Sequence, residues 1–96
     1  MSWSCDLVSD KKIFKSQVQS IVDHLPKKWL REGLVNTLQD WGWHLFCDIH
    51  LPEGCKLGIG GSPLIVSIDE AKPFVEHFKH KLERDYEHRI DVQWEK

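Results

Sequence analysis

Hydrophobic residues recur along this chain in two alternating rhythms. Across residues 10–41, and again across 74–86, they return every third or fourth position, which is the spacing of one face of a helix. Across residues 44–51 and 89–95 they return every second position, which is the spacing of one face of a strand. This order predicts an α+β domain, in which an antiparallel sheet of four or five strands is packed on one face by three helices.

The first helical stretch divides into two predicted helices. Ser9 or Asp10 can cap the first helix, whose apolar stripe consists of Phe14, Val18, Ile21 and Leu25. Proline is tolerated in a helix chiefly in its first turn. Pro26 therefore favours a second helix that begins near it and runs to about Trp41.

Strand patterns occur at both ends of the chain and in its middle. At the start, Trp3, Cys5 and Leu7 alternate with polar residues, and at the end Ile90, Val92 and Trp94 do the same. In the middle, residues 44–51, 56–59 and 64–68 predict three strands joined by turns, an antiparallel meander in which the apolar run 64–68 fits a buried strand. We expect the first and last strands to pair.

The last helix has two conflicting signals at its start. Ser67 and Glu70 have the S-x-x-E spacing of a capping box. Pro73, however, lies too deep for a long helix that begins at Ser67, because a proline lacks the N–H that continues the helical hydrogen bonds. The sequence therefore predicts a short turn over residues 69–72 and a main helix that begins at Pro73. The apolar face of that helix consists of Phe74, Val75, Phe78, Leu82 and Tyr86.

Composition places the chain among ordinary globular proteins. Its 96 residues predict a single domain over residues 1–96, and 41% hydrophobic with 29% charged residues is too apolar for a disordered tail. The net charge of −2 provides no strong field of one sign for a polyanion. No apolar run has the length needed to cross a bilayer, so we expect a cytoplasmic protein that does not associate with membranes.

The three cysteines, Cys5, Cys47 and Cys55, show no C-x-x-C spacing. Their odd number and irregular spacing argue against a disulfide framework and a zinc knuckle, and favour reduced thiols. A single Cys47–Cys55 bridge across a hairpin is the alternative.

No catalytic motif stands out, and the sequence predicts no catalytic residue and no cofactor. The glycine-rich residues 58–62 are followed by Pro63 and an apolar run rather than by a helix, so a hairpin turn explains them better than a phosphate-binding loop. Asp48 and His50 lie on one face of a predicted strand and are ligand types for zinc or iron. They form the weaker, metal-binding alternative, because they need further ligands from elsewhere.

Aromatic residues are the most unusual feature of the chain's composition. There are five tryptophans, and Trp29 falls off the apolar stripe of the predicted second helix, between Lys28 and Arg31. Phe46 falls on the polar face of the predicted strand 44–51. Large aromatic side chains among polar residues are typical of interface anchors. The predicted partner-binding residues are therefore Trp29, Lys28, Arg31, Phe46, His44, Asp48 and His50.

These observations favour a small non-catalytic protein that acts by docking on a protein partner, as inhibitors, immunity-type proteins and adaptor subunits do. The alternatives are a small metal-binding protein or enzyme that uses Asp48 and His50, and a nucleic-acid accessory protein that uses the basic N-terminal helices. Nucleic acid is the less favoured partner because no aromatic-studded strand is evident. A homodimer is left open.

Overall fold

The computed structural model describes residues 2–30 and 45–95. The elements run in the order β1 (Trp3–Ser9), α1 (Lys15–Asp23), the 3₁₀ helix η1 (Lys27–Trp29), β2 (Asp48–Ile49), β3 (Lys56–Gly61), α2 (Ile68–Tyr86) and β4 (Ile90–Glu95). The four strands form one antiparallel sheet in the order β2-β3-β1-β4. Strands and α-helices in this sequence and sheet order make the split β-α-β arrangement known as ferredoxin-like.

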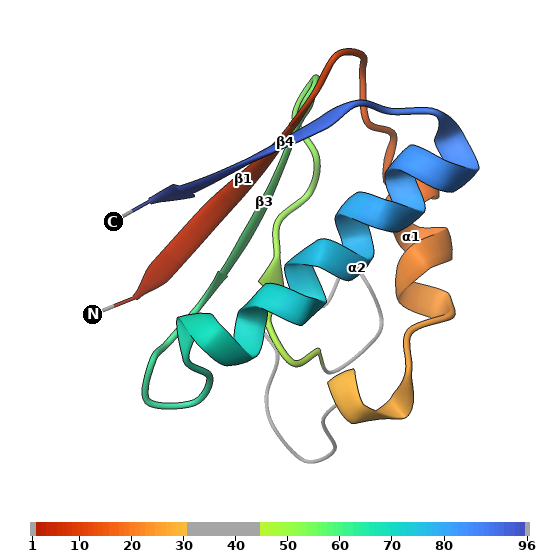
Figure 1. Cartoon of the computed structure of the whole chain (residues 1–96). Helices are drawn as coiled ribbons and strands as arrows, with labels where there is room; N and C mark the ends of the chain where they lie inside the picture. Colours follow the sequence, from red (N-terminus) through yellow and green to blue (C-terminus); the bar gives the residue numbers. More distant parts are fainter. Residues whose placement is uncertain (1, 31–44, 96) are drawn as a thin grey trace.

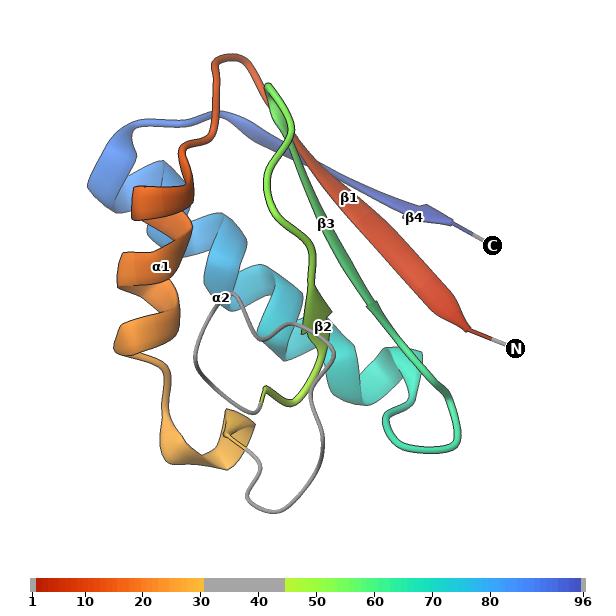
Figure 2. The same ribbon diagram turned by 180° about the vertical axis from the view of Figure 1, so that it is seen from behind.

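The α+β class and the antiparallel sheet are confirmed, and β1 pairs with β4 as expected. The register places Cys5 opposite both Ile59 of β3 and Trp94 of β4. Helices α1 and α2 cover one face of the sheet and leave the other face open (Figures 1 and 2). Two α-helices are described rather than three, and the sheet has four strands in the described part of the chain.

The core lies between the sheet and the two helices. Alternate residues of β1 are buried, and α2 contributes Phe74, Phe78 and Leu82, none of which is exposed to solvent. From α1, Val18, Ile21 and Val22 are buried. The alternation in the first strand and the helical spacing in the last helix therefore predicted the core residues correctly, because both elements bury one face against the same layer.

The predicted helix from Pro26 to Trp41 differs from the structure where it can be compared. Residues 27–29 form the 3₁₀ turn η1, and Leu30 is extended and bridges to Leu45. Residues 31–41 lie outside the described part of the chain. The segment leaves the helix at Leu30 because its backbone pairs there: the carbonyl of Trp29 accepts a hydrogen bond of 2.8 Å from the N–H of Phe46.

The start of α1 also differs from the prediction. The helix begins at Lys15 after Phe14, not after Ser9 or Asp10. Those two polar side chains bind the connection between α2 and β4 instead. The Asp10 carboxylate accepts the backbone N–H of Arg89 at 3.0 Å, and the Ser9 hydroxyl lies 2.6 Å from Nδ1 of His88.

Helix α2 begins at the capping box and continues through Pro73, so the predicted start at Pro73 is wrong. Ser67 Oγ accepts the N–H of Glu70, and Glu70 Oε1 accepts the N–H of Ser67, each at 3.2 Å. Pro73 is exposed, and the helical bond that it cannot donate involves the carbonyl of Asp69 in the first turn. Burial of Ala71, Phe74 and Val75 along the same helix offsets that loss.

The predicted buried strand over residues 64–68 is wrong as well. β3 extends through Gly61, and the chain then makes a turn before α2. Leu64 is 94% exposed and Ile65 is 59% exposed, so the apolar run meets no partner strand.

Candidate functional site

The most unusual surface feature is the connection between β3 and α2, residues 62–67, which we call the apolar turn. It exposes Leu64 and Ile65, and the neighbouring Ile68 at the start of α2 is 42% exposed. Large apolar side chains that stand together in water are more informative than one exposed leucine, because they mark surfaces that another molecule covers.

The apolar turn is held by its own hydrogen bonds. The N–H groups of Ile65 and Val66 both donate to the carbonyl of Ser62, at 2.9 and 2.8 Å. The N–H of Leu64 donates to the Ser62 hydroxyl at 3.4 Å. The capping box at Ser67 then fixes the entry into α2. The backbone that presents Leu64 and Ile65 is thus held by hydrogen bonds from within the chain.

Trp3 clamps the apolar turn to the sheet. Its indole N–H donates to the carbonyl of Val66 at 2.9 Å, and the Val66 side chain is only 2% exposed. The indole ring also lies against Gly61, where a Cβ would approach Cζ2 of Trp3 to 2.7 Å. Only glycine fits at this position without displacing the ring.

Beside the apolar turn, the open face of the sheet carries two adjoining hollows that share His50. The first, of about 280 Å³, is lined by Asp6, His50, Leu51, Glu53, Lys56 and Gly58. The second, of about 310 Å³, is lined by Ser2, Trp3, Ser4, Asp48, His50, Gly60, Gly61 and Ser62. The hollows exist because Gly58 and Gly60 of β3 place no side chain between the flanking strands. The second hollow ends at Ser62, where the apolar turn begins.

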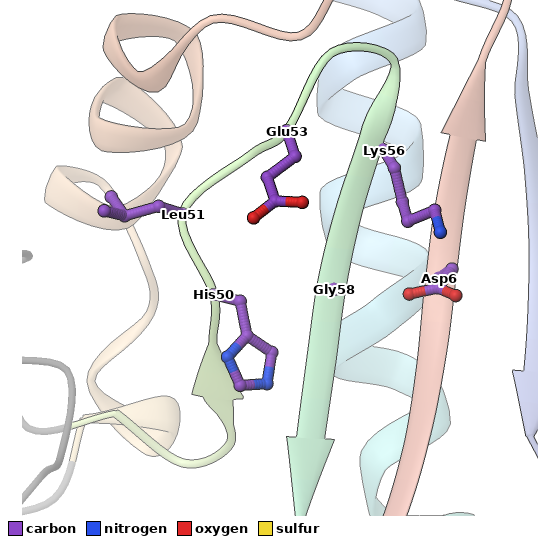
Figure 3. Close-up of a pocket in the computed structure, with 6 residues that line it drawn as sticks. All are labelled: Asp6, His50, Leu51, Glu53, Lys56 and Gly58. Atoms are coloured by element: carbon purple, nitrogen blue, oxygen red, sulfur yellow. The ribbon is translucent and has the colours of Figure 1, made fainter.

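Figure 3 shows the first hollow from the open side of the sheet. The imidazole of His50 lies toward Gly58, consistent with the 3.1 Å that a Cβ at Gly58 would leave to Cδ2 of His50. The carboxylate of Glu53 is directed into the same hollow, and Lys56 and Asp6 line its other edge. Across both hollows the lining carries the carboxylates of Asp6, Asp48 and Glu53 against the single ammonium of Lys56.

This charge and shape bear on the kind of ligand that the open face can receive. Sheets that bind single-stranded RNA stack the bases on exposed aromatic rings. Here the lining of the two hollows is mostly acids, serines, glycines and His50, with Lys56 and Leu51 in the first hollow and Trp3, only 5% exposed, in the second. Carboxylates repel phosphate, so this face suits a basic or neutral ligand.

Trp29 is not the exposed anchor that the sequence predicted. It is only 8% exposed, and its ring packs edge-on against Phe74 at 5.5 Å and against His77 at 5.1 Å between centroids. Lys28 is exposed and its Nζ lies 4.8 Å from the centre of the Trp29 ring. The prediction is wrong because it assumed an α-helix that begins near Pro26. Residues 27–29 form the 3₁₀ helix η1 instead, which directs the indole onto α2.

Phe46 does not lie on the open polar face either. It is partly buried, packs against the core, and its ring centroid lies 6.2 Å from that of Phe74. Asp48 and His50 do lie on the open face, and both line the second hollow. His44 and Arg31 lie outside the described residues. The structure therefore brings Asp48 and His50 together at one site and removes Trp29 and Phe46 from it.

No group of three or more histidine, cysteine, aspartate or glutamate side chains that could hold a metal ion occurs among residues 2–30 and 45–95. Cys47 is buried and Cys55 is exposed, and both are thiols rather than a disulfide. Cys5 is also buried, which, with the nearby Asp6 carboxylate, raises the pKa of its thiol to about 12. Nothing at these positions favours the metal-binding alternative.

A buried polar network lies at the opposite end of α2. His88 is 3% exposed and Ser9 is 8% exposed. Nε2 of His88 lies 2.9 Å from Oε1 of Gln17, an atom that can only accept, so Nε2 carries the proton and Nδ1 accepts from the Ser9 hydroxyl at 2.6 Å. A serine–histidine pair can activate a nucleophile. Here the burial of both residues leaves a substrate no access. Together with Gln17 of α1, the pair ties β1 and α1 to the connection between α2 and β4.

Sequence reasoning missed Leu64 and Ile65, the two most exposed large hydrophobic residues in the described part of the chain. A signal was present, since Pro63 and Ser62 precede them and a capping box follows at once. That leaves no room for a strand and its turns between Gly61 and Ser67.

No protein-family model, curated protein or solved structure matches this chain, so its function must be inferred from the geometry of the site. Among the described helices, none is long and apolar enough to span a bilayer.

Proposed function

We propose that this protein is a non-catalytic binding module that docks on a protein partner through the apolar turn and the second hollow beside it. The observation that carries the proposal is the exposure of Leu64 and Ile65 on a turn whose backbone is already fixed. An ordered binding segment loses little conformational entropy on docking, so more of its contact energy appears as affinity.

The charges around the turn indicate which partner surface fits. Asp69 and Glu70 follow Ile68 in the first turn of α2, and Asp48 lines the second hollow. Lys72 pairs with Asp69 at 3.5 Å, so the carboxylates of Glu70 and Asp48 carry the excess negative charge. Carboxylates around an apolar projection repel anionic lipid headgroups and nucleic-acid phosphates. They complement a protein pocket that is apolar at its centre and bordered by lysine or arginine side chains.

The test begins with identification of the partner by affinity capture from the native host, and is decided by calorimetry with the purified partner. Full burial of a leucine or isoleucine side chain contributes about 1.5–3 kcal/mol, so Leu64→Ser and Ile65→Ser should each weaken binding roughly tenfold or more. Asp48→Asn should weaken it less and reduce its dependence on salt.

Leu51→Ser is the matched control. Leu51 is 44% exposed but lines the first hollow rather than the second, so its removal should leave the affinity nearly unchanged. Equal affinity of the wild-type protein and the two turn variants for the purified partner would rule out the proposed docking surface.

A further inference from the structure

Strand β4 is an outer strand of the sheet, and nothing in the described part of the chain pairs with its far side. The sheet order ends at β4, and Figures 1 and 2 show no described segment beyond it. The strand is six residues long and contains no proline. Its outer backbone N–H and C=O groups are therefore open to another strand.

The side chains on the helix side of β4 are incompletely covered. Ile90 is 8% exposed, whereas Val92 and Trp94 are only partly buried against the core. Trp94 contacts Trp3 with 5.9 Å between ring centroids and belongs to the outer strand of the sheet. A strand placed beyond β4 would bury more of Val92 and Trp94, which is a favourable term.

The charges on β4 discriminate between the ways in which two copies could pair. If antiparallel pairing were centred on Gln93, Asp91 would lie opposite Glu95 of the other copy, and like charges directly opposite are destabilising. If it is centred on Val92, Arg89, the residue before β4, lies opposite Glu95 of the other copy, whose carboxylate already accepts from the Ser4 hydroxyl of its own chain. In that register Ile90 also faces Trp94, and Asp91 faces Gln93. The cross-strand pairs that form about Val92 are thus opposite charges, apolar pairs and a carboxylate–amide pair.

We propose that two copies of this chain associate antiparallel through their β4 edges, centred on Val92, so that the two sheets become continuous. This inference goes beyond the proposed docking function, because neither Leu64 nor Ile65 takes part. A second copy is the favoured occupant since the complementary pattern is present within β4 and the preceding Arg89. A single strand edge is small beside the ~1,600 Å² of a standard interface, so the dimer should dissociate on dilution.

Sedimentation velocity over a concentration series up to about 1 mM tests this, since even an association of ~4 kcal/mol is visible at that concentration. The mass should rise from 11.3 kDa towards twice that value. Glu95→Arg and Arg89→Glu each replace two attractive pairs by repulsive ones and should weaken the dimer about tenfold. The double variant Arg89→Glu with Glu95→Arg should restore it.

A second measurement uses the unmodified protein. Amide hydrogen exchange over residues 90–95 should slow as the concentration rises, because pairing protects the edge N–H groups. Leu64→Ser is the control and should leave the dimer intact. A protein that stays monomeric at every concentration, a dimer that ignores the charge exchange, or a dimer abolished by Leu64→Ser would each overturn the proposal.

Discussion

The two ends of helix α2 reverse the usual distribution of polar and apolar side chains. At its start, the apolar turn holds Leu64 and Ile65 in water. At its end, His88 and Ser9 are polar and buried. Both arrangements oppose the tendency of a folded chain to bury apolar and expose polar groups.

The difference lies in how each end satisfies its groups. At the polar end, both ring nitrogens of His88 have hydrogen-bond partners, Gln17 and Ser9. These bonds replace the hydrogen bonds to water that the ring loses on burial. At the apolar end, no other part of the described chain covers the side chains of Leu64 and Ile65, although the backbone of the turn is hydrogen-bonded. One end therefore contributes to folding, and the other is available for contact with another molecule.

The largest expected effect in this comparison is at the polar end. His88→Ala leaves the Ser9 hydroxyl and the Gln17 amide without their buried partner and creates a cavity. We expect the free energy of unfolding to fall by about 3 kcal/mol. Urea denaturation followed by circular dichroism measures it, and a loss below about 1 kcal/mol would mean that water replaces the imidazole.

The next largest loss of stability is expected where Trp3 contacts Gly61 and Val66 and so holds the apolar turn against the sheet. Gly61→Ala places a Cβ 2.7 Å from the Trp3 ring, so the ring must shift and its bond to the carbonyl of Val66 must lengthen. Overpacking of this kind costs about 1–3 kcal/mol. Thermal unfolding gives the loss, and indole N–H exchange should accelerate. Unchanged exchange would show that Trp3 does not clamp the turn.

Acid should weaken the polar end. Burial lowers the pKa of His88 below its ordinary value, Lys11 lowers it further, and Asp10 opposes them. The unfolded chain therefore takes up the proton more readily than the folded chain. The stabilisation is fully present above about pH 6.5 and is lost as pH falls through that value toward the folded-state pKa.

The contribution of His88 can be isolated by comparison with His88→Gln. The pKa of His77 is lowered too, chiefly by burial and then by Lys81 and Lys28, so the wild-type curve contains both histidines. Unfolding free energies at pH 7.5 and 5.5 should differ less in His88→Gln than in the wild type. Parallel curves for the two proteins would show that His88 does not resist protonation.

The smallest effect on stability is expected at the apolar end. Leu64→Ser removes a side chain that is 94% exposed, so the free energy of unfolding should change by no more than about 0.5 kcal/mol. The same denaturation assay measures it. A loss of several kcal/mol would show that Leu64 packs inside the molecule, and the contrast between the two ends would disappear.

The spacing of apolar residues was sufficient to predict those elements that bury a single face between the sheet and the helices. The alternation at Trp3, Cys5 and Leu7 predicted β1 because the sheet is buried on that side alone, and Phe74 and Phe78 on the last helix were predicted for the same reason. Pairing of β1 with β4 was also expected and is confirmed.

Local pattern failed where a distant group decides the outcome. Trp29 is buried because α2 supplies Phe74 and His77. Ser9 contacts its neighbours Asp10 and Lys11, but its shortest hydrogen bond is to the distant His88. The run 64–68 is not a strand because no strand lies beside it in the described chain. Of the candidate site, Asp48 and His50 were predicted, whereas Leu64 and Ile65 were read as core since apolarity alone does not reveal exposure.

The position of Cys55 gives an experimental route to the binding end. Cys55 directly precedes β3, and the apolar turn follows the other end of this strand. The Cys55 thiol and Leu64 therefore lie at opposite ends of β3. Both other thiols are buried. A maleimide–biotin reagent should therefore modify Cys55 selectively and tether the molecule with the apolar turn facing the solution. A tag joined near Trp3 or Glu95 would instead emerge beside that turn, and could shield it from whatever it binds.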